Sequence, residues 1–376
     1  MTAPEPLRLA FLGDPNSVHT RRWMRFFADA GHAVALLDGY GFDIRPGLDE
    51  RIVIERYTIP TRRRGLSALA IRRALRQAIY RFQPHVLHAH YVSRYGWQAR
   101  LSGFHPYVVS AWGSDVHTRP YESLRARVWT ILALRGADLV TVVNEPMRQA
   151  VRSLGAPADR ISLVQHGVDT TFFKPGRPNR RFLGRLGLEP GRYLLSPRGI
   201  APVYRQRTVV EAFARLPSDG LRLVLSARNA DQAELTRVRG RAVRLGVDGR
   251  LVILDEIEED SRLHVALYRG AAAVISVPER DSFPVTAQEA MATGTPLVLS
   301  DLAPAREVLG PIDPALLVPV GDAEALASAV RRVLDMDAEA RRALGARLRE
   351  HVVREADYRT NMQRMESLYR ALATRR

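Results

Sequence analysis

The clearest fold signal in this chain is the stretch Asp281-Ser-Phe-Pro-Val-Thr-Ala-Gln-Glu289-Ala-Met-Ala-Thr-Gly-Thr-Pro296. It follows an apolar run that ends at Val277-Pro278, which predicts a buried strand. A helix is expected to open near Pro284, because proline suits a first helical turn. A strand, a short polar loop and a helix in this order are typical of a parallel α/β unit. The free amides and the dipole of such a helix attract anions, so the stretch predicts an anion site at the helix N-terminus.

Two carboxylates stand out in this stretch. Asp281 is placed in the loop before the expected helix, and Glu289 is placed on the helix. Glu289 could accept hydrogen bonds from two ribose hydroxyls, and Asp281 could accept them from sugar hydroxyls. The alternative is structural: Asp281 and Ser282 cap the helix, and Glu289 is solvated. The spacing leaves both interpretations open.

The same alternation of apolar runs and amphipathic segments continues outward along the chain, which predicts parallel strands joined by crossover helices. The first half offers strands at 7–13, 33–38, 86–90, 107–112, 139–143 and 161–166, with helices at about 19–30, 65–82, 122–136 and 145–154. The second half restarts with strands at 193–197, 221–227, 251–254, 273–277, 296–300 and 316–320. A Pro/Gly/Arg-rich stretch at 174–181 is the expected linker. The chain therefore reads as two α/β halves.

Composition fits this division. A chain of 376 residues exceeds the size of one hydrophobic core, so two domains are expected. The chain has no cysteine, which excludes disulfides, a thiol nucleophile and thiolate metal sites. No apolar run is long enough to cross a bilayer, and the first residues lack a signal-peptide core. We expect a cytoplasmic protein.

The net charge of +16 comes almost entirely from arginine, because Lys174 is the only lysine. The excess is concentrated in the first half: between Glu55 and Asp115 there are ten arginines and no acidic residue. Arginine pairs bidentately with phosphates, so this asymmetry indicates an anionic partner for the first half. A bias towards arginine codons is the simpler explanation of the overall excess.

The stretch 281–296 resembles the E-x7-E signature of the large family-4 retaining glycosyltransferases (glycosyl transferases group 1), with Asp281 in place of the first glutamate. Further motifs match in order along the chain: Ala137-Asp138-Leu139-Val140, Val143-Asn144, Gly167-Val168-Asp169, Glu211-Ala212-Phe213, Leu317-Val318-Pro319 and Gly321-Asp322. The resemblance implies the GT-B fold, an α/β architecture with two Rossmann-like domains facing across a cleft. The expected domains are an acceptor-side domain at 1–176, a nucleotide-sugar-binding domain at 177–356, and a C-terminal helix at 357–376 that crosses back to the first domain.

The resemblance also assigns a donor site to the second half. Arg198, in the place where relatives hold an arginine, is expected to grip the donor diphosphate and to act in catalysis with Asp281. The neighbouring lysine of relatives falls on Tyr204, so Arg205 or Arg207 is proposed to supply the missing charge. The full set of expected donor-binding residues is Gly13, Arg198, Arg205, Ser282, Phe283, Pro284, Val285 and Glu289. Relatives have glycines where this chain has Ala227-Arg228-Asn229 and Asp255-Glu256, and glycine at these places lets the backbone approach the nucleotide.

The acceptor side falls on the first half. The loop that begins at Gly13 precedes an expected helix capped by Asn16 or Ser17. It lacks the G-x-G-x-x-G fingerprint, so a nicotinamide cofactor is not expected. His19 could contact the acceptor, although a structural role is the commoner one for a histidine in a first helical turn.

A second acceptor-side segment is Trp112-Gly-Ser-Asp115-Val-His117. Many relatives hold a histidine where this chain has Trp112, which can stack on a sugar but cannot shuttle a proton. Asp115 is then the nearest candidate catalytic group, and Trp112 and His117 are acceptor candidates. His88 and His90 lie on one face of an expected strand, but no third ligand has convincing spacing, so no metal is expected.

The segment 62–82 reads as a basic amphipathic helix, with Ile71, Leu75, Ile79 and Phe82 on one face. Its apolar face can pack on the sheet, or the helix can lie on the inner face of an anionic membrane. Nucleic acid is not expected, because no recognised nucleic-acid motif is present.

The sequence therefore predicts a glycosyltransferase that moves a sugar from a nucleotide-diphosphate sugar to a carbohydrate, lipid-linked or small-molecule acceptor, with retention and without metal. The alternatives are a non-catalytic partner subunit, or a phosphorylase or epimerase, on the same fold.

Overall fold

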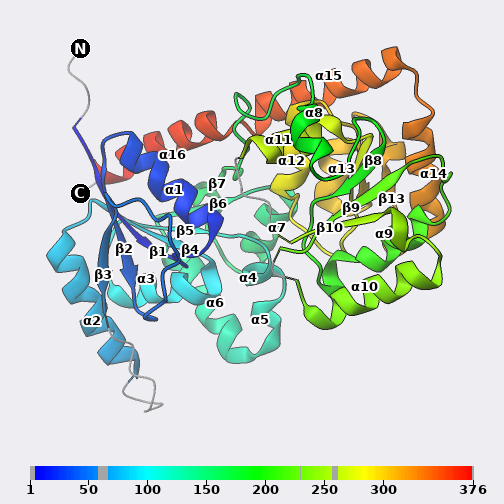
Figure 1. Ribbon diagram of the computed structural model, residues 1–376. Coiled ribbons are helices and arrows are strands. Elements are labelled where there is room, and N and C mark those ends of the chain that lie inside the picture. The colour runs from blue at the N-terminus through cyan, green and yellow to red at the C-terminus, as the bar shows by residue number, and fades with distance from the viewer. Residues whose placement is uncertain (1–4, 58–66, 229, 256–260, 375–376) are drawn as a thin grey trace. The chain divides into compact units, whose positions relative to one another are not determined.

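The computed structural model describes residues 5–57, 67–228, 230–255 and 261–374 (Figure 1). The internal contacts divide the chain into two units. Unit 1 comprises Met1–His166 and Arg359–Arg376, and unit 2 comprises Gly167–Tyr358. The boundary between the units thus follows His166. The boundary expected from the sequence lay ten residues later, after residue 176. The last helix returns to unit 1.

Unit 1 is built on a seven-stranded parallel sheet in the order β3-β2-β1-β4-β5-β6-β7. Its strands are β1 (Arg8–Leu12), β2 (Ala33–Asp38), β3 (Val53–Arg56), β4 (Val86–His90), β5 (Tyr107–Ser110), β6 (Leu139–Val142) and β7 (Ile161–Leu163). Its α-helices are α1 (Val18–Asp29), α2 (Ser67–Phe82), α3 (Trp97–Ser102), α4 (Ser114–His117), α5 (Arg119–Glu122), α6 (Leu124–Gly136), α7 (Glu145–Ser153) and α16 (Tyr358–Ala373).

Helices cover both faces of this sheet, which explains why its central strands read as continuous apolar runs. Alternate strand residues such as Ala10, Leu87 and Val109 share one buried cluster with Leu75 of α2 and Ala133 of α6. On the opposite face Phe11 and His88 contact Trp23 and Phe27 of α1 and Tyr369 of α16. Thus α2, α3 and α6 form one layer, and α1 and α16 form the other (Figure 1).

Unit 2 repeats the design with a six-stranded parallel sheet in the order β10-β9-β8-β11-β12-β13. Its strands are β8 (Tyr193–Ser196), β9 (Arg222–Ser226), β10 (Leu251–Leu254), β11 (Ala273–Ser276), β12 (Leu297–Ser300) and β13 (Leu317–Val318). Its α-helices are α8 (Arg180–Gly184), α9 (Gln206–Phe213), α10 (Gln232–Arg244), α11 (Arg262–Gly270), α12 (Val285–Thr293), α13 (Ala303–Leu309), α14 (Ala323–Leu334) and α15 (Ala338–Glu355). The two Rossmann-like α/β units that the sequence predicted are confirmed.

Each sheet has a point where the strand order reverses. In unit 1 it lies between β1 and β4, and in unit 2 between β8 and β11. At such a point the crossover connections depart to opposite sides, and a crevice opens beyond the carboxyl ends of the two strands. The fold therefore marks the loops after β1 and β4, and the loops after β8 and β11, as the places to look for ligands.

Two local predictions need correction. The edge strand β3 was missed, because only Glu55 of its four residues is even partly buried and the segment has no alternating apolar pattern. Pro284 was expected inside the first helical turn, but it occupies the N-cap position and α12 begins at Val285. An extended residue at the N-cap is common, so the shift is of one residue only.

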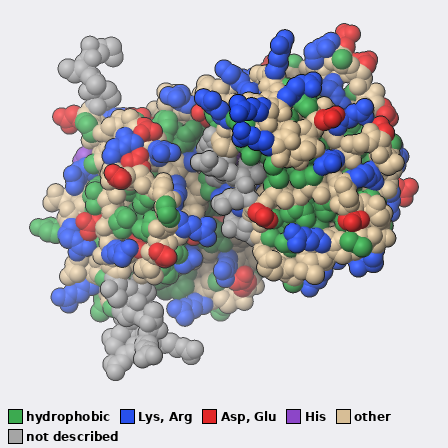
Figure 2. All heavy atoms as spheres, viewed as in Figure 1, with side chains coloured by type: hydrophobic (Ala, Val, Ile, Leu, Met, Phe, Trp, Pro, Cys, Tyr) green, Lys and Arg blue, Asp and Glu red, His purple; other side chains and the backbone are tan. Residues whose placement is uncertain are grey.

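Basic side chains are widespread on the visible face of the described chain. Figure 2 shows blue Lys and Arg side chains spread widely over the visible face, with fewer red acidic side chains between them. Within the described residues, no helix has the length and apolarity that crossing a bilayer would require.

Candidate functional site

The loops at the reversal point of unit 2 bring Arg198 and Asp281 together. Arg198 follows β8 by two residues, and Asp281 lies between β11 and α12. Nη2 of Arg198 donates to Oδ2 of Asp281 at 2.6 Å, and both side chains are about 15% exposed. Burial raises the pKa of Asp281, while the Arg198 guanidinium and the Ser282 amide act in the opposite direction. The expected diphosphate-binding cation is therefore paired with the expected sugar-binding carboxylate.

Two further contacts fix the loop that carries Arg198. Gln206 Nε2 donates to the Arg198 carbonyl at 2.9 Å, and Ser196 Oγ donates to Gln206 Oε1 at 2.9 Å. The next residue, Gly199, is so close to the loop after β9 that a Cβ there would lie 2.8 Å from the Arg228 carbonyl oxygen. The loops after β8 and β9 are thus packed backbone to backbone.

Tyr204, in the place where relatives hold a lysine, takes part in the same cluster. The Arg198 guanidinium carbon lies 4.6 Å from the centroid of the Tyr204 ring, which is a cation–π distance. Arg205 has a left-handed backbone with φ of 52° and forms an ion pair with Glu279, two residues before Asp281. Arg207 instead donates to the buried Glu234 of α10 at 2.9 Å. Of the two arginines, Arg205 is the one connected to the loop of Asp281.

Glu289 is buried on α12 rather than solvated, so the solvated alternative for this residue is wrong. The Tyr268 hydroxyl donates to Glu289 Oε2 at 2.6 Å, and His264 Nε2 lies 3.5 Å from the same oxygen. Burial and the Glu289 charge raise the pKa of Tyr268 well above its ordinary value, so its hydroxyl stays protonated and donates. Tyr268 and His264 come from α11, and neither was identified from the sequence.

The short segment between Asp281 and α12 has a constrained backbone. The Ser282 amide donates to Oδ1 of Asp281 at 2.7 Å. Phe283 has a φ of 70°, a conformation that non-glycine residues adopt rarely. Pro284 holds the N-cap position without a side-chain hydrogen bond, and Val285 opens the helix. Strain of this kind clusters at ligand sites, and here it lies beside the Arg198–Asp281 pair.

In unit 1, three aromatic side chains from different parts of the chain gather after the strands, one from the start of α1 and two from the segments that follow β5 and β7. His19, in the first turn of α1, stacks on His166 with ring centroids 4.2 Å apart, and the edge of Trp112 approaches both rings. Gly13 packs against the first turn of α1, where a Cβ would lie 3.1 Å from Thr20 Cγ2. Trp112 and His19 were predicted from the sequence, whereas His166 was not.

The histidines of this cluster are held neutral. Burial and the nearby Arg22 lower the pKa of His19 to about 4, and burial lowers the pKa of His90 and His166 well below the ordinary value. His88 contacts Tyr369 through Nδ1 and Ser110 through Nε2, so both of its ring nitrogens are taken. In the described part of the chain no three His, Asp or Glu side chains are grouped as metal ligands.

Asp115 organises the turn after β5. It is fully buried, and its two oxygens accept the amides of Val92 at 2.7 Å, Trp112 at 3.0 Å and Gly113 at 2.8 Å. Burial raises the pKa of Asp115 to about 6 against the effect of these amides. The geometry gives Asp115 a positioning role beneath Trp112, and its predicted catalytic role stays a prediction. His117, two residues on, is exposed at the end of α4.

Comparison with known proteins identifies the class. Residues 8–144 match the family described as "Glycosyl transferase 4-like", and residues 185–351 match "Glycosyl transferases group 1". The chain belongs to the group 1 glycosyltransferases, with the GT-B fold.

Individual relatives agree with this assignment. A D-inositol 3-phosphate glycosyltransferase of Corynebacterium efficiens is 30% identical, and the match covers 67% of this chain and 61% of that protein. The chain thus spans about three fifths of the length of this curated relative. Among solved structures, Anabaena HepE in complex with UDP has a TM-score of 0.82 at 17% identity, covering 97% of this chain and 100% of that one. Sucrose-phosphate synthase from Thermosynechococcus elongatus has a TM-score of 0.79 at 22% identity, covering 98% and 99%.

Proposed function

We propose that this protein transfers a sugar from a nucleotide-diphosphate sugar to an acceptor hydroxyl, with retention of anomeric configuration and without a metal. The observation that carries the proposal is the placement of Arg198, Asp281 and Glu289 around the reversal point of the unit 2 sheet, where open parallel sheets bind ligands. A cation for phosphate and two carboxylates for hydroxyls are the groups that a nucleotide-sugar requires.

In this proposal each donor-site residue has a separate role. The Glu289 carboxylate, oriented by Tyr268, accepts hydrogen bonds from the ribose hydroxyls. Arg198 exchanges its bond with Asp281 for the donor diphosphate, assisted by Arg205, and the released Asp281 accepts hydrogen bonds from the sugar. Ser282, Phe283, Pro284 and Val285 present the backbone of the α12 N-terminus to the donor.

The chemical step breaks the bond between the anomeric carbon and the phosphate oxygen and forms a bond to the acceptor oxygen. The acceptor proton passes to the departing phosphate, so no strong protein base is needed. Arg198 then stabilises the charge that develops on the leaving group, and removing one such donor costs about 10²–10³ in rate.

The acceptor is proposed to bind beyond the unit 1 sheet, at the Gly13 loop, His19, Trp112 and His117. An indole offers a flat face to a sugar ring, and neutral imidazoles offer hydrogen bonds without repelling an acceptor. A carbohydrate, a lipid-linked sugar or a phosphorylated small molecule suits these groups, and a lipid-linked acceptor would bring unit 1 to a membrane surface. Because a curated relative is named for D-inositol 3-phosphate, that compound belongs in the acceptor panel.

The test is a thermal-shift panel of UDP, GDP, ADP, dTDP and CMP, run with EDTA on the wild type and on Glu289→Ala. UDP is the first nucleotide to try, since Anabaena HepE was solved with UDP and with UDP-glucose. A ligand at 100-fold its Kd adds about 2.7 kcal/mol, which raises the Tm by several degrees. Stabilisation of the wild type but not of Glu289→Ala supports a metal-free donor site on α12.

Transfer itself is then measured with the matching UDP-sugar and the acceptor panel. If no nucleotide stabilises the wild type, the proposal fails. The non-catalytic partner subunit would then be the favoured alternative. Three observations would support it: Arg198 is paired with Asp281, Tyr204 replaces the lysine of relatives, and Trp112 replaces their histidine.

A further inference from the structure

The outer face of the α2–α3–α6 layer in unit 1 has an unusual composition. These three helices contain eight arginines, four from α2, one from α3 and three from α6, and no aspartate or glutamate. Because α3 contacts both α2 and α6, the three helices form one continuous layer. In most surface helices acidic side chains offset basic ones. In this layer they do not, so all charged side chains of the three helices are positive.

Long apolar side chains stand among these arginines. Leu69 and Tyr80 of α2 are 68% and 77% exposed, and Leu124 at the start of α6 is 79% exposed. Along α6 the exposed apolar positions continue at Val128 and Leu132, one helical turn apart each time. These positions form an apolar stripe that no described part of the chain covers.

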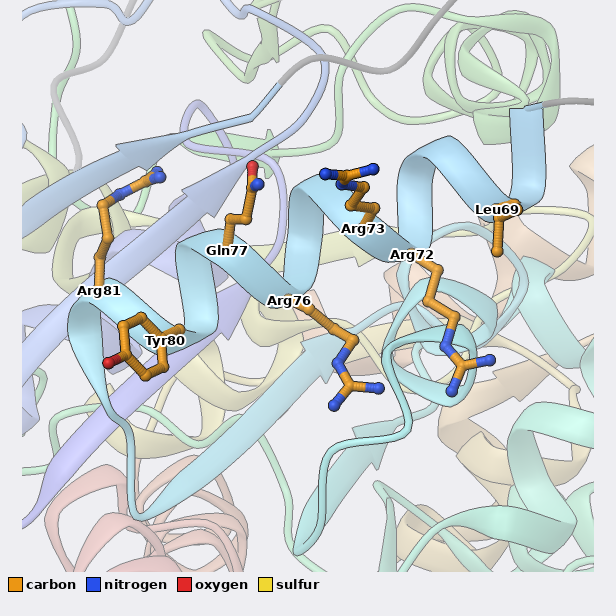
Figure 3. Close-up of a pocket in the computed structure, with 7 residues that line it drawn as sticks. All are labelled: Leu69, Arg72, Arg73, Arg76, Gln77, Tyr80 and Arg81. Atoms are coloured by element: carbon orange, nitrogen blue, oxygen red, sulfur yellow. The ribbon is translucent and has the colours of Figure 1, made fainter.

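Figure 3 shows how the exposed side of α2 is arranged. Leu69, Arg72, Arg76 and Tyr80 form one stripe along the helix, and Arg73, Gln77 and Arg81 form a second stripe beside it. The buried side of α2, with Ile71, Leu75, Ile79 and Phe82, packs on the sheet. The apolar side of α2 thus packs on the sheet, as the sequence predicted, and the side that carries the arginines is exposed.

The arginines of this face are mostly uncommitted. Arg81 forms an ion pair with Glu55 at 2.8 Å, but within the described residues Arg72, Arg73 and Arg76 have no acidic partner. Arg127 lies over the Tyr121 ring at 5.6 Å, which leaves its charge available.

We propose that this face, defined by the exposed side chains of α2 and α6, docks on the surface of an anionic lipid bilayer. The arginines attract acidic headgroups, and Leu69, Tyr80, Leu124 and Val128 enter the boundary between headgroups and acyl chains. The apolar side chains decide between this partner and a nucleic acid or other polyanion, which would gain nothing from exposed leucines. The proposal does not depend on sugar transfer by the protein.

The test is flotation of the purified chain with vesicles that contain phosphatidylglycerol in phosphatidylcholine, at low and high salt. Pure phosphatidylcholine vesicles are the comparison. The charge variant combines Arg72→Gln, Arg73→Gln and Arg76→Gln. Its matched control combines Arg239→Gln, Arg244→Gln and Arg342→Gln, which removes the same charge from exposed positions of unit 2.

A second pair of variants tests the apolar stripe. Leu124→Ser with Val128→Ser removes it, and Val243→Ser with Val353→Ser is the control, because those valines of unit 2 are 62% and 41% exposed. We expect the charge variant to weaken binding on the order of a hundredfold, and the stripe variant by about tenfold. Both controls should bind as the wild type does, and high salt should release the protein.

Three results would overturn the proposal. One is no flotation of the wild type with phosphatidylglycerol vesicles at low salt. Another is equal loss of binding in the charge variant and its control, which would indicate a net-charge effect. The third is full binding by the stripe variant, which would indicate a general polyanion surface. A Tm without nucleotide equal to that of the wild type shows that each variant is folded, whether or not the donor site binds a nucleotide. Loss of flotation at an unchanged Tm is therefore distinguished from unfolding and from failure of the donor site.

Discussion

Replacing Tyr268 by phenylalanine removes one hydroxyl from the centre of the proposed donor site and leaves the ring in place. The hydroxyl donates to Glu289 at 2.6 Å, in a region where Tyr268 has no exposed surface and Glu289 has 6%. A hydrogen bond to a charged group contributes about 1.5–3 kcal/mol to stability. We therefore expect Tyr268→Phe to lower the free energy of unfolding by about 2 kcal/mol, which corresponds to a decrease in Tm of about 6 °C.

The structure supplies a matched control in Tyr193. Its hydroxyl is equally buried in unit 2 and donates at 2.6 Å, but the acceptor is the uncharged carbonyl of Leu267. Tyr193→Phe should cost about 1 kcal/mol and leave nucleotide binding unchanged. Tyr268→Phe should weaken nucleotide binding about fivefold. Without the tyrosine hydroxyl, the ligand itself must order the Glu289 side chain, and the conformational entropy lost in doing so costs about 1 kcal/mol.

The assay combines denaturant unfolding with calorimetric titration of the stabilising nucleotide, and a double-mutant cycle with Glu289→Gln isolates the pair. We expect a coupling free energy of about 1 kcal/mol or more between the two substitutions. Equal losses of stability in the two tyrosine variants, with additive effects in the cycle, would refute the special role of Tyr268. Unchanged nucleotide affinity in Tyr268→Phe would refute its positioning role while leaving the stability argument intact.

Three more predictions follow from burial and close contact. Because burial raises the folded-state pKa of Asp281, the protonated carboxyl stabilises the folded state below about pH 4, and this stabilisation is lost as the pH rises. In a series of Tm measurements against pH, Asp281→Asn should lack the corresponding decrease in Tm. Because burial lowers the folded-state pKa of His19 to about 4, the stabilisation that the neutral imidazole contributes is lost as the pH falls below about 6.5. His19→Gln should therefore reduce the decrease in Tm between about pH 6.5 and pH 4. Gly199→Ala should lower the Tm and weaken nucleotide binding, since its Cβ would lie 2.8 Å from the Arg228 carbonyl, whereas Gly240→Ala, inside α10, should raise the Tm.

The fold could be predicted from the sequence because its strands are buried on both faces. β4 and β11 consist entirely of buried residues, and such runs between amphipathic segments have few interpretations other than a parallel α/β sheet. The edge strand β3 failed this criterion, since three of its four residues are exposed. Its position is set by pairing with β2 rather than by its own side chains.

The site could be predicted only in part. Arg198, Asp281 and Glu289 could be found because each lies near the end of a predicted strand or within the stretch 281–296. Tyr268 and His264 could not, since they lie on α11, where one apolar face is expected to pack against the sheet. His166 was hidden for another reason. It lies 147 residues from His19 in sequence, and only the return of β7 to the sheet edge brings the two rings together.

The Arg198–Asp281 pair shows what a motif leaves undetermined. The spacing of the stretch 281–296 predicts a carboxylate near the donor sugar, but not that this carboxylate pairs with Arg198. A shorter side chain than the glutamate of relatives reaches Arg198 at 2.6 Å, and burial raises the pKa of Asp281 even beside that cation. The pair therefore lies in a low-dielectric pocket, where an unpaired charge would be costly. In the proposed donor site, an incoming diphosphate would replace one anionic partner of Arg198 by another. We therefore expect that the departure from the family motif does not weaken donor binding, provided that the sugar hydroxyls donate to the released Asp281.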